Sequence, residues 1–268
     1  MIYLLIYVFT GIFAGLAAGL LGVGGGIVNV PALDFIFCRQ GIDPDVSFHL
    51  ALGTSLAIIV FTSASAAYAH WRRGTVDVGF GWRAGLGGIV GSVVSSFAAA
   101  HLQFTILKPA FALFLIFAAV RLLTEKEIRG REPRGGPWLA VVVGFLAGLL
   151  AGFFGVGGGI IAIPLMLWIA RFDPPQALAT SNLIIVLVGI FGSFTYLYTG
   201  WTVTAAIPHA AGYVHLLALI FVAPLSILTA RLGVRLAHAI DSLWLKRLFA
   251  LMLFAVGWRF VWDVLYGG

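Results

Sequence analysis

The sequence predicts an all-α integral membrane protein built from two homologous halves. Three observations carry this prediction: the composition, the lengths of the apolar segments and an internal repeat of glycine-rich motifs. Of the 268 residues, 61% are hydrophobic and 10% are charged, and the mean hydropathy is +1.07. Soluble domains are about 45–50% apolar and about 25% charged, so this composition excludes a water-soluble globular enzyme and a disordered chain.

The apolar segments set the number of membrane crossings. A helix needs about 20 apolar residues to cross a hydrocarbon core of about 30 Å. Segments 27–37 and 160–170 are far shorter than that, and each directly follows a glycine cluster. The other apolar segments are 2–21, 49–70, 79–101, 106–123, 138–154, 177–199, 207–230 and 246–265.

Sequence motifs from the first half of the chain recur in the second half. GIFAGLAAGLLGVGGG at 11–26 returns as GFLAGLLAGFFGVGGG at 144–159, and ALGTS at 51–55 returns as ALATS at 177–181. A third match, between LKPAFAL and LKRLFAL, lies near the end of each half. Internal repeats of this kind are common in transporter folds.

One hydrophilic stretch separates the repeats and sets the predicted domain boundaries. We expect an N-terminal repeat at 1–123, a cytoplasmic linker at 124–137 and a C-terminal repeat at 138–268, which together make one transport domain. Each repeat consists of a broken or re-entrant helix unit with glycines at its tip, followed by three transmembrane helices.

Basic residues indicate how the two repeats are oriented. Cytoplasmic loops carry an excess of Lys and Arg. If every basic loop is cytoplasmic, the unit 138–170 leaves and re-enters on one side, and the two repeats have inverted topology. The alternative treats each glycine unit as one long broken span, which makes the repeats parallel. The basic residues of the loops used in this comparison are Arg72, Arg73, Arg83, Lys126, Arg129, Arg131, Arg134, Arg231, Arg235, Lys246 and Arg247.

The two GVGGG motifs are the strongest candidates for a binding site. Non-helical backbone inside a bilayer must be buried in protein or line a wet cavity. The short helices that follow would point their N-termini, each with about +0.5 of a charge, toward the midplane, which suits an anion. Close helix packing is the alternative, and it better explains the glycines spaced by four. The predicted site glycines are Gly24, Gly25, Gly26, Gly157, Gly158 and Gly159.

Polar residues near the glycine motifs extend this candidate site. Thr54, Ser55, Thr180, Ser181 and Asn182 could donate to an anion, although helix capping and interhelical hydrogen bonds explain them equally well. Asn29 is close to the first glycine motif, where contact with the anion is favoured over a local helix cap. Pro31 and Pro164 are predicted hinges in the short helices. Candidates for coupling or gating are Asp34, which could instead lie at the membrane interface, and His70, His209 and His215, which could be purely structural.

Several classes of function find no support in the sequence. The net charge of +6 is explained by cytoplasmic loops, so no nucleic acid is expected as a partner. Cys38 is the only cysteine, and the glycine motifs contain no acidic residue that could ligate a cation. GxxxxGK[ST], GxSG and HExxH are all absent, so we expect no cofactor, no metal site and no enzyme.

Two segments also carry a family resemblance. GLLGVGGGIVNVPAL at 19–33 and GFFGVGGGIIAIPLM at 152–166, each followed by an A-x-[GA]-T-S motif, resemble the TauE/SafE family of sulfite exporters and toluene-sulfonate-uptake permeases. The resemblance implies a bacterial or archaeal inner-membrane permease for small sulfur-containing anions such as sulfite or organosulfonates.

The expected mechanism is secondary transport by alternating access around the glycine motifs. The expected partners are the small anion and the lipid bilayer, with a homodimer as a further possibility. An anion channel, or a carrier for another small anion on the same fold, is the alternative, and a membrane-embedded enzyme is a weaker one.

Overall fold

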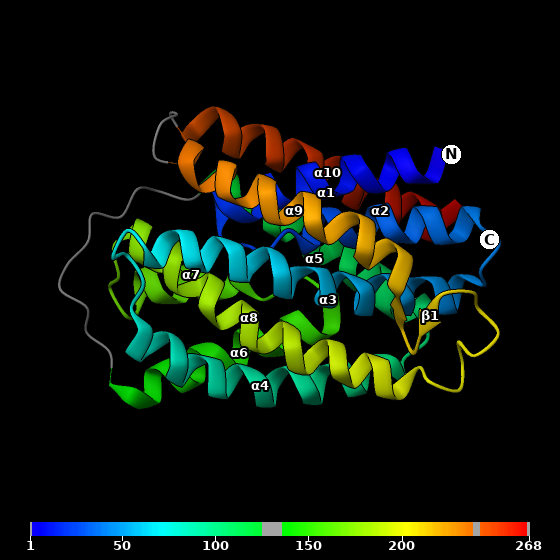
Figure 1. Ribbon diagram of the computed structural model, residues 1–268, viewed down its shortest axis with the longest axis horizontal. Helices are drawn as coiled ribbons and strands as arrows, with labels where there is room; N and C mark the ends of the chain where they lie inside the picture. The colour runs from blue at the N-terminus through cyan, green and yellow to red at the C-terminus, as the bar shows by residue number, and fades with distance from the viewer. Residues whose placement is uncertain (1, 125–135, 238–241, 267–268) are drawn as a thin grey trace.

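The computed structural model describes residues 2–124, 136–237 and 242–266, and within them the chain is almost entirely helical (Figure 1). The basic side chains of the predicted linker lie outside the described residues. The elements are α1 (Ile2–Leu21), α2 (Gly26–Arg39), α3 (Pro44–Trp71), α4 (Val78–Ala100), α5 (Phe104–Thr124), α6 (Pro137–Phe154), α7 (Gly159–Trp168), α8 (Pro174–Thr199), β1 (Ala210–Ala211), β2 (Val214–His215), α9 (Leu216–Ala237) and α10 (Ser242–Tyr266).

Glycine stripes let two pairs of helices approach at backbone distance. α1 packs on α9, and α6 packs on α4. A methyl group on Gly15 would overlap the Ser226 carbonyl, and one on Gly144 would overlap the Ala84 carbonyl. The packing interpretation of the glycines spaced by four is therefore confirmed.

The helix contacts repeat between the two halves of the chain. In each half the first helix packs against the fourth helix of the other half, which gives the pairs α1–α9 and α6–α4. The third helices, α3 and α8, pack against each other, and so do the fifth helices, α5 and α10. Side-chain hydroxyls also join helices of opposite halves: Ser92 Oγ on α4 donates to the Val188 carbonyl on α8 at 2.9 Å.

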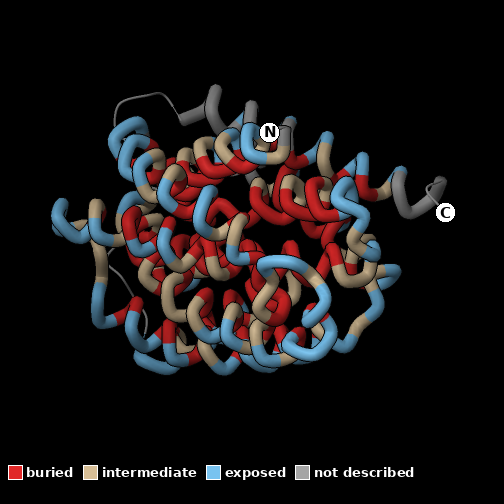
Figure 2. The backbone as a smooth tube through the Cα atoms, turned by 45° about the vertical axis from the view of Figure 1, so that its right-hand side comes forward, coloured by how far each residue is buried: buried red, intermediate tan, exposed pale blue. Residues whose placement is uncertain are grey.

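The outer surface of the bundle is apolar, as a lipid-facing surface should be. Figure 2 shows the buried residues concentrated inside the bundle and the exposed ones around it. Trp138, Leu113 and Phe194 are 80%, 65% and 63% exposed, respectively. Seven helices within the described residues are long and apolar enough to cross a membrane. They include α1 and α6, which the sequence prediction placed in re-entrant units; length and composition alone do not separate a crossing helix from a re-entrant one.

The segment predicted at 207–230 begins later than expected. Residues 210–215 form a two-stranded antiparallel hairpin in which Ala210 pairs with His215, and α9 starts only at Leu216. Proline at 208 and the positive φ angles of His209 (62°) and Gly212 (54°) interrupt the helix. α3 also differs, since it begins at Pro44, five residues before the predicted segment.

Basic segments far apart in the sequence meet at one end of the molecule. In Figure 1 the connection between α3 and α4 lies at the left-hand end, and the N-terminus and the β1–β2 hairpin lie at the right-hand end. The Arg73 guanidinium donates to the Val234 carbonyl at 3.3 Å, and Arg231 Nε donates to Ser65 Oγ at 3.1 Å. The C-terminal ends of α3 and α9 are therefore neighbours.

Candidate functional site

Each glycine motif forms a loop between two helices. The first glycine loop, residues 22–25, joins α1 to α2, and the second, residues 155–158, joins α6 to α7. Gly25 and Gly158, which immediately precede α2 and α7, have φ angles of 85° and 75°. Residues with a side chain rarely adopt this left-handed conformation, so the turns themselves require glycine.

Two serines link the loops of opposite halves. Ser55 on α3 donates its hydroxyl to the Gly155 carbonyl at 2.7 Å, and Ser181 on α8 donates to the Gly22 carbonyl at 3.0 Å. Both serine side chains are fully buried. These predicted site residues do lie beside the glycine loops. The single hydroxyl hydrogen of Ser55 holds a loop carbonyl, and that of Ser181 is shared between the Gly22 carbonyl and the Leu178 carbonyl of its own helix at 2.8 Å.

The glycine loops also touch each other directly. A methyl group on Gly26 would overlap the Gly155 carbonyl, and one on Gly159 would overlap the Gly22 carbonyl. The N-termini of α2 and α7 therefore meet the loop of the opposite half with no side chain between them. An anion could contact both loops only after they move apart.

The starts of α2 and α7 carry buried backbone amides that donate to no acceptor in the part of the chain that the structure describes. More than about 90% of buried backbone N–H groups in proteins are hydrogen-bonded, so a cluster of exceptions calls for an acceptor from outside the chain. Helix N-termini with free amides favour anions. Amides that donate no hydrogen bond to the described part of the chain include those of Gly24, Gly25, Ile27, Gly157, Gly158 and Ile160.

Three buried polar side chains near the loops have nitrogen or oxygen atoms with no hydrogen-bond partner among the described residues. Asn29, on the first turns of α2, makes no side-chain hydrogen bond to the described residues from either amide atom. Asn182 donates its amide to the Leu178 carbonyl, but its Oδ1 has no partner there. The Ser63 hydroxyl is equally unpartnered and lies 3.2 Å from where a Gly24 methyl would be. Ser63 was missed from the sequence because the second repeat has glycine at that position.

The predicted threonines accept backbone hydrogen bonds at two helix starts. Thr54 Oγ1 accepts from the His215 amide at 2.8 Å, and Thr180 Oγ1 accepts from the Asp77 amide at 3.1 Å. His215 and Asp77 immediately precede α9 and α4, so the two contacts are equivalent in the two halves. Each threonine therefore ties its own long helix to a helix start in the opposite half.

The predicted hinge prolines both lie inside the short helices. Pro31 is in α2 and Pro164 is in α7. Proline lacks the N–H that would bond to the carbonyl four residues earlier, so the carbonyls of Ile27 and Ile160 lose that partner. The helical turn next to each glycine loop is thereby weakened.

Asp34 is paired rather than exposed at an interface. It is 3% exposed, its carboxylate lies 3.5 Å from Lys108 Nζ on α5, and it accepts from Ser47 Oγ at 3.1 Å. The Lys108 ammonium also lies 4.9 Å from the centre of the Phe260 ring. Lys108 was not among the predicted site residues, although a lysine within an apolar segment was the signal for it.

The candidate histidines do not form one cluster. His70 lies at the C-terminal end of α3, at the opposite end of the molecule from His209 and His215 (Figure 1). His215 Nδ1 accepts from the Ala218 amide at 3.2 Å and so caps α9. Burial, with a smaller contribution from His209, lowers the pKa of His215 to about 4, so its ring is neutral at pH 7.

The fold and these loops define a multi-pass helical membrane protein with paired glycine turns at its centre. Comparison with known families agrees: the family described as Sulfite exporter TauE/SafE matches residues 7–260. The chain belongs to this family of membrane transporters.

Curated relatives carry the same general description. A Methanocaldococcus jannaschii protein named probable membrane transporter protein MJ0441 is 31% identical over 247 residues, covering 89% of this chain and 88% of the relative. Bacillus subtilis YunE, also named a probable membrane transporter protein, is 30% identical over 200 residues, covering 68% and 73%. A Haemophilus influenzae probable membrane transporter protein is 29% identical and covers 88% and 90%.

Proposed function

We propose that the protein is a secondary transporter of the cytoplasmic membrane that carries small sulfur-containing anions, such as sulfite or organosulfonates, by alternating access. The substrate site lies between the two glycine loops. One observation carries this proposal: the N-termini of α2 and α7 meet the opposite glycine loops with buried amides that have no hydrogen-bond acceptor among the described residues. The family's sulfite exporter description supports the choice of substrate.

The charges around the loops favour an anion over a cation. Each helix N-terminus contributes about +0.5 of a charge, and neither glycine loop contains a carboxylate. The nearest acidic residue along α2 is Asp34, which is already paired with Lys108. A cation would need oxygen ligands such as carboxylates, and these loops do not supply them.

We further propose that the two halves are inverted-topology repeats. Equivalent contacts support this: Ser55 pairs with the second glycine loop as Ser181 pairs with the first. The basic ends of α3 and α9 lie together, so both fall on the cytoplasmic side, as the positive-inside tendency requires. Parallel repeats would leave the basic segment after α9 on the opposite side.

Transport requires the two halves to separate at the glycine loops. The serine hydrogen bonds and the direct loop contact close the site in the present conformation. The weakened turns at Pro31 and Pro164 allow each short helix to tilt without breaking further backbone hydrogen bonds. Rocking of one half against the other then exposes the free amides to one side of the membrane at a time.

Asn29→Leu tests the site without straining the fold. The two side chains have similar size, and the buried amide has no hydrogen-bond partner within the described residues, so leucine should leave stability unchanged or raise it. If the amide contacts the anion, uptake of labelled sulfite into proteoliposomes falls at least about tenfold. Ser193→Ala is the control, since among the described residues the Ser193 hydroxyl donates to the Ile190 carbonyl of its own helix.

The following outcomes decide the proposal. Lost uptake with retained thermal stability supports a ligand role for Asn29. Wild-type uptake in Asn29→Leu, or no sulfite or sulfonate uptake by the native protein, would overturn the proposal. Counterflow, in which internal unlabelled sulfite accelerates entry of label, is expected from a carrier; its absence would favour an anion channel.

A further inference from the structure

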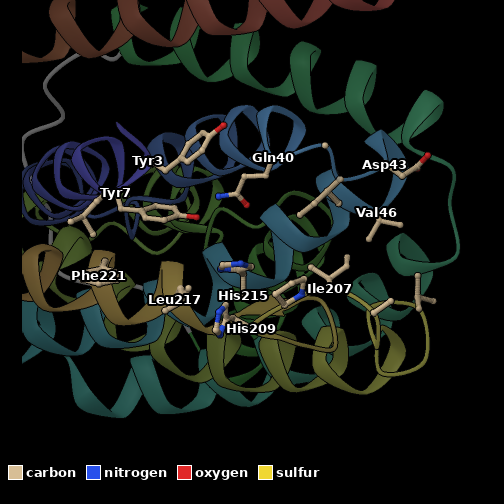
Figure 3. Close-up of a pocket in the computed structure, with 16 residues that line it drawn as sticks. Tyr3, Tyr7, Gln40, Asp43, Val46, Ile207, His209, His215, Leu217 and Phe221 are labelled. Carbon is tan, nitrogen blue, oxygen red and sulfur yellow. The ribbon is translucent and has the colours of Figure 1, made fainter. Parts of the chain in front are cut away.

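A cavity of about 660 Å³ opens at the end of the molecule that carries the N-terminus and the β1–β2 hairpin (Figure 3). Its walls come from the start of α1, the connection between α2 and α3, residues 203–209 and the start of α9. No residue of either glycine loop lines it. We call it the hairpin-side cavity; it is separate from the site proposed above.

The cavity offers uncharged hydrogen-bond donors beside apolar wall, and its lining also includes the Asp43 carboxylate. Tyr7 is 5% exposed, and its hydroxyl, which faces the Gln40 amide in Figure 3, has no hydrogen-bond partner of ordinary geometry among the described residues. Because His215 Nδ1 accepts the α9 cap bond, the proton of its neutral ring lies on Nε2. Leu217 and Phe221 supply apolar wall next to these donors.

A smaller hollow of about 150 Å³ lies at the opposite end of the molecule and is lined by the equivalent residues of the other repeat. Residues 136, 137 and 140 there correspond to 3, 4 and 7 through the offset of 133 between α1 and α6. Residues 77, 79 and 83 correspond to 215, 217 and 221 through the offset of 138 between α4 and α9. A hollow that recurs at equivalent positions belongs to the repeated architecture and is not a local packing defect.

The two hollows differ in chemistry as well as size. Asp77 takes the place of His215 and caps α4 by accepting from the Phe80 amide at 2.9 Å. Arg83 takes the place of the apolar Phe221. The smaller hollow therefore holds a carboxylate and a guanidinium at these positions, whereas the hairpin-side cavity has the neutral His215 and the apolar Phe221 there and the acidic Asp43 elsewhere in its lining.

We propose that the hairpin-side cavity is a loading site for an organic anion. His215 Nε2–H and the Tyr7 hydroxyl hydrogen-bond the anionic group, and the apolar body of the ligand packs on Leu217 and Phe221. The volume falls in the range of about 300–1,000 Å³ that is typical of small-molecule sites, far larger than a bare inorganic oxyanion needs. This inference rests on the proposed transport function and adds a second site to it.

A short chain of contacts connects this cavity to the glycine loops. The His215 amide donates to Thr54 Oγ1, and the neighbouring Ser55 donates to the Gly155 carbonyl. His215 also packs against Phe37 of α2, with ring centres 5.0 Å apart. A ligand that displaces His215 from this arrangement therefore acts on the contacts that hold the loops closed.

Binding of benzenesulfonate and methanesulfonate to the purified full chain, measured by calorimetric titration, tests the loading site. Benzenesulfonate should bind at least about tenfold more tightly, because its ring reaches the apolar wall. Tyr7→Phe, which removes the hydroxyl that faces the Gln40 amide and should fold normally, weakens benzenesulfonate binding about tenfold. Leu217→Trp fills the cavity and reduces binding further. Tyr198→Phe, on an exposed part of α8 at the same end, is the control and leaves binding unchanged.

Sulfite uptake by the same preparations separates this inference from the proposed function. Equal binding of the two sulfonates, or native affinity in folded Tyr7→Phe and Leu217→Trp, overturns the loading site even where sulfite uptake is intact. Tyr7-dependent benzenesulfonate binding without uptake of sulfite or any sulfonate supports the cavity site and overturns the proposed function.

Discussion

Adding one methyl group at the start of α2 or α7 tests whether the glycine loops pack as described. In Gly26→Ala the new methyl overlaps the Gly155 carbonyl and lies 2.6 Å from Val156 Cα. In Gly159→Ala it overlaps the Gly22 carbonyl and lies 3.0 Å from Val23 Cα. These neighbours are backbone atoms, which move only if a whole loop shifts.

The expected magnitude follows from two opposing effects. Overpacking in a tight interior costs about 1–3 kcal/mol, and alanine regains up to about 1 kcal/mol over glycine in a helix. The net loss is therefore centred on about 1–2 kcal/mol. For a chain of this size, that lowers the midpoint of thermal unfolding by roughly 2–8 °C.

Thermal unfolding in detergent, followed by circular dichroism, measures this effect. Gly79→Ala on α4 is the matched control, because its methyl would meet only Asp77 Oδ1 at 3.5 Å, an ordinary contact. The control should be as stable as the native chain or more so. If Gly26→Ala and Gly159→Ala unfold at the same temperature as Gly79→Ala, the loops do not touch and the reasoning fails.

Three further predictions concern other parts of the molecule. Lys108→Met leaves the buried Asp34 carboxylate without its ion-pair partner and should lower the free energy of unfolding by about 3 kcal/mol. A second change, Asp34→Asn, should restore most of that loss. A double variant as unstable as Lys108→Met alone would contradict the pairing. Because the pKa of His215 is about 4 in the folded state and 6.5 normally, the free energy of unfolding should fall as the pH drops from about 6.5 to about 4. The variant His215→Asn keeps a side-chain oxygen that can cap α9, and it should make the free energy of unfolding less dependent on pH over this range. Cysteines at 72 and 200 in an otherwise cysteine-free chain should be labelled from opposite sides of the membrane, and labelling from one side would reject the inverted topology.

Features that depend on the repeated motifs were predictable from the sequence. The glycine motifs marked both loops, because only consecutive glycines tolerate the left-handed turns at Gly25 and Gly158. The matched A-x-[GA]-T-S motifs placed Ser55 and Ser181 beside the loops, although not their hydrogen bonds to the loop carbonyls of the opposite half. Those bonds depend on how the halves interlock, which sequence spacing does not reveal.

Features that lack a counterpart in the other repeat were missed or misplaced. Lys108 lies in a matched motif, but its partner Asp34 corresponds to Leu167, so repeat comparison could not pair them. The hairpin before α9 has apolar residues on both strands and looks like the start of a helix. The hairpin-side cavity combines short pieces from separate parts of the chain, none of which carries a motif of its own.

The position of a bound oxyanion tests the central claim most directly. Crystals of transport-competent protein soaked in selenite, a heavier analogue of sulfite, would locate the anion by the anomalous scattering of selenium. We expect the peak between the two glycine loops, within hydrogen-bonding distance of amides at the starts of α2 and α7. A peak confined to the hairpin-side cavity, or no peak between glycine loops that have moved apart in crystals of protein that takes up selenite, would contradict the assignment of the glycine loops as the anion site.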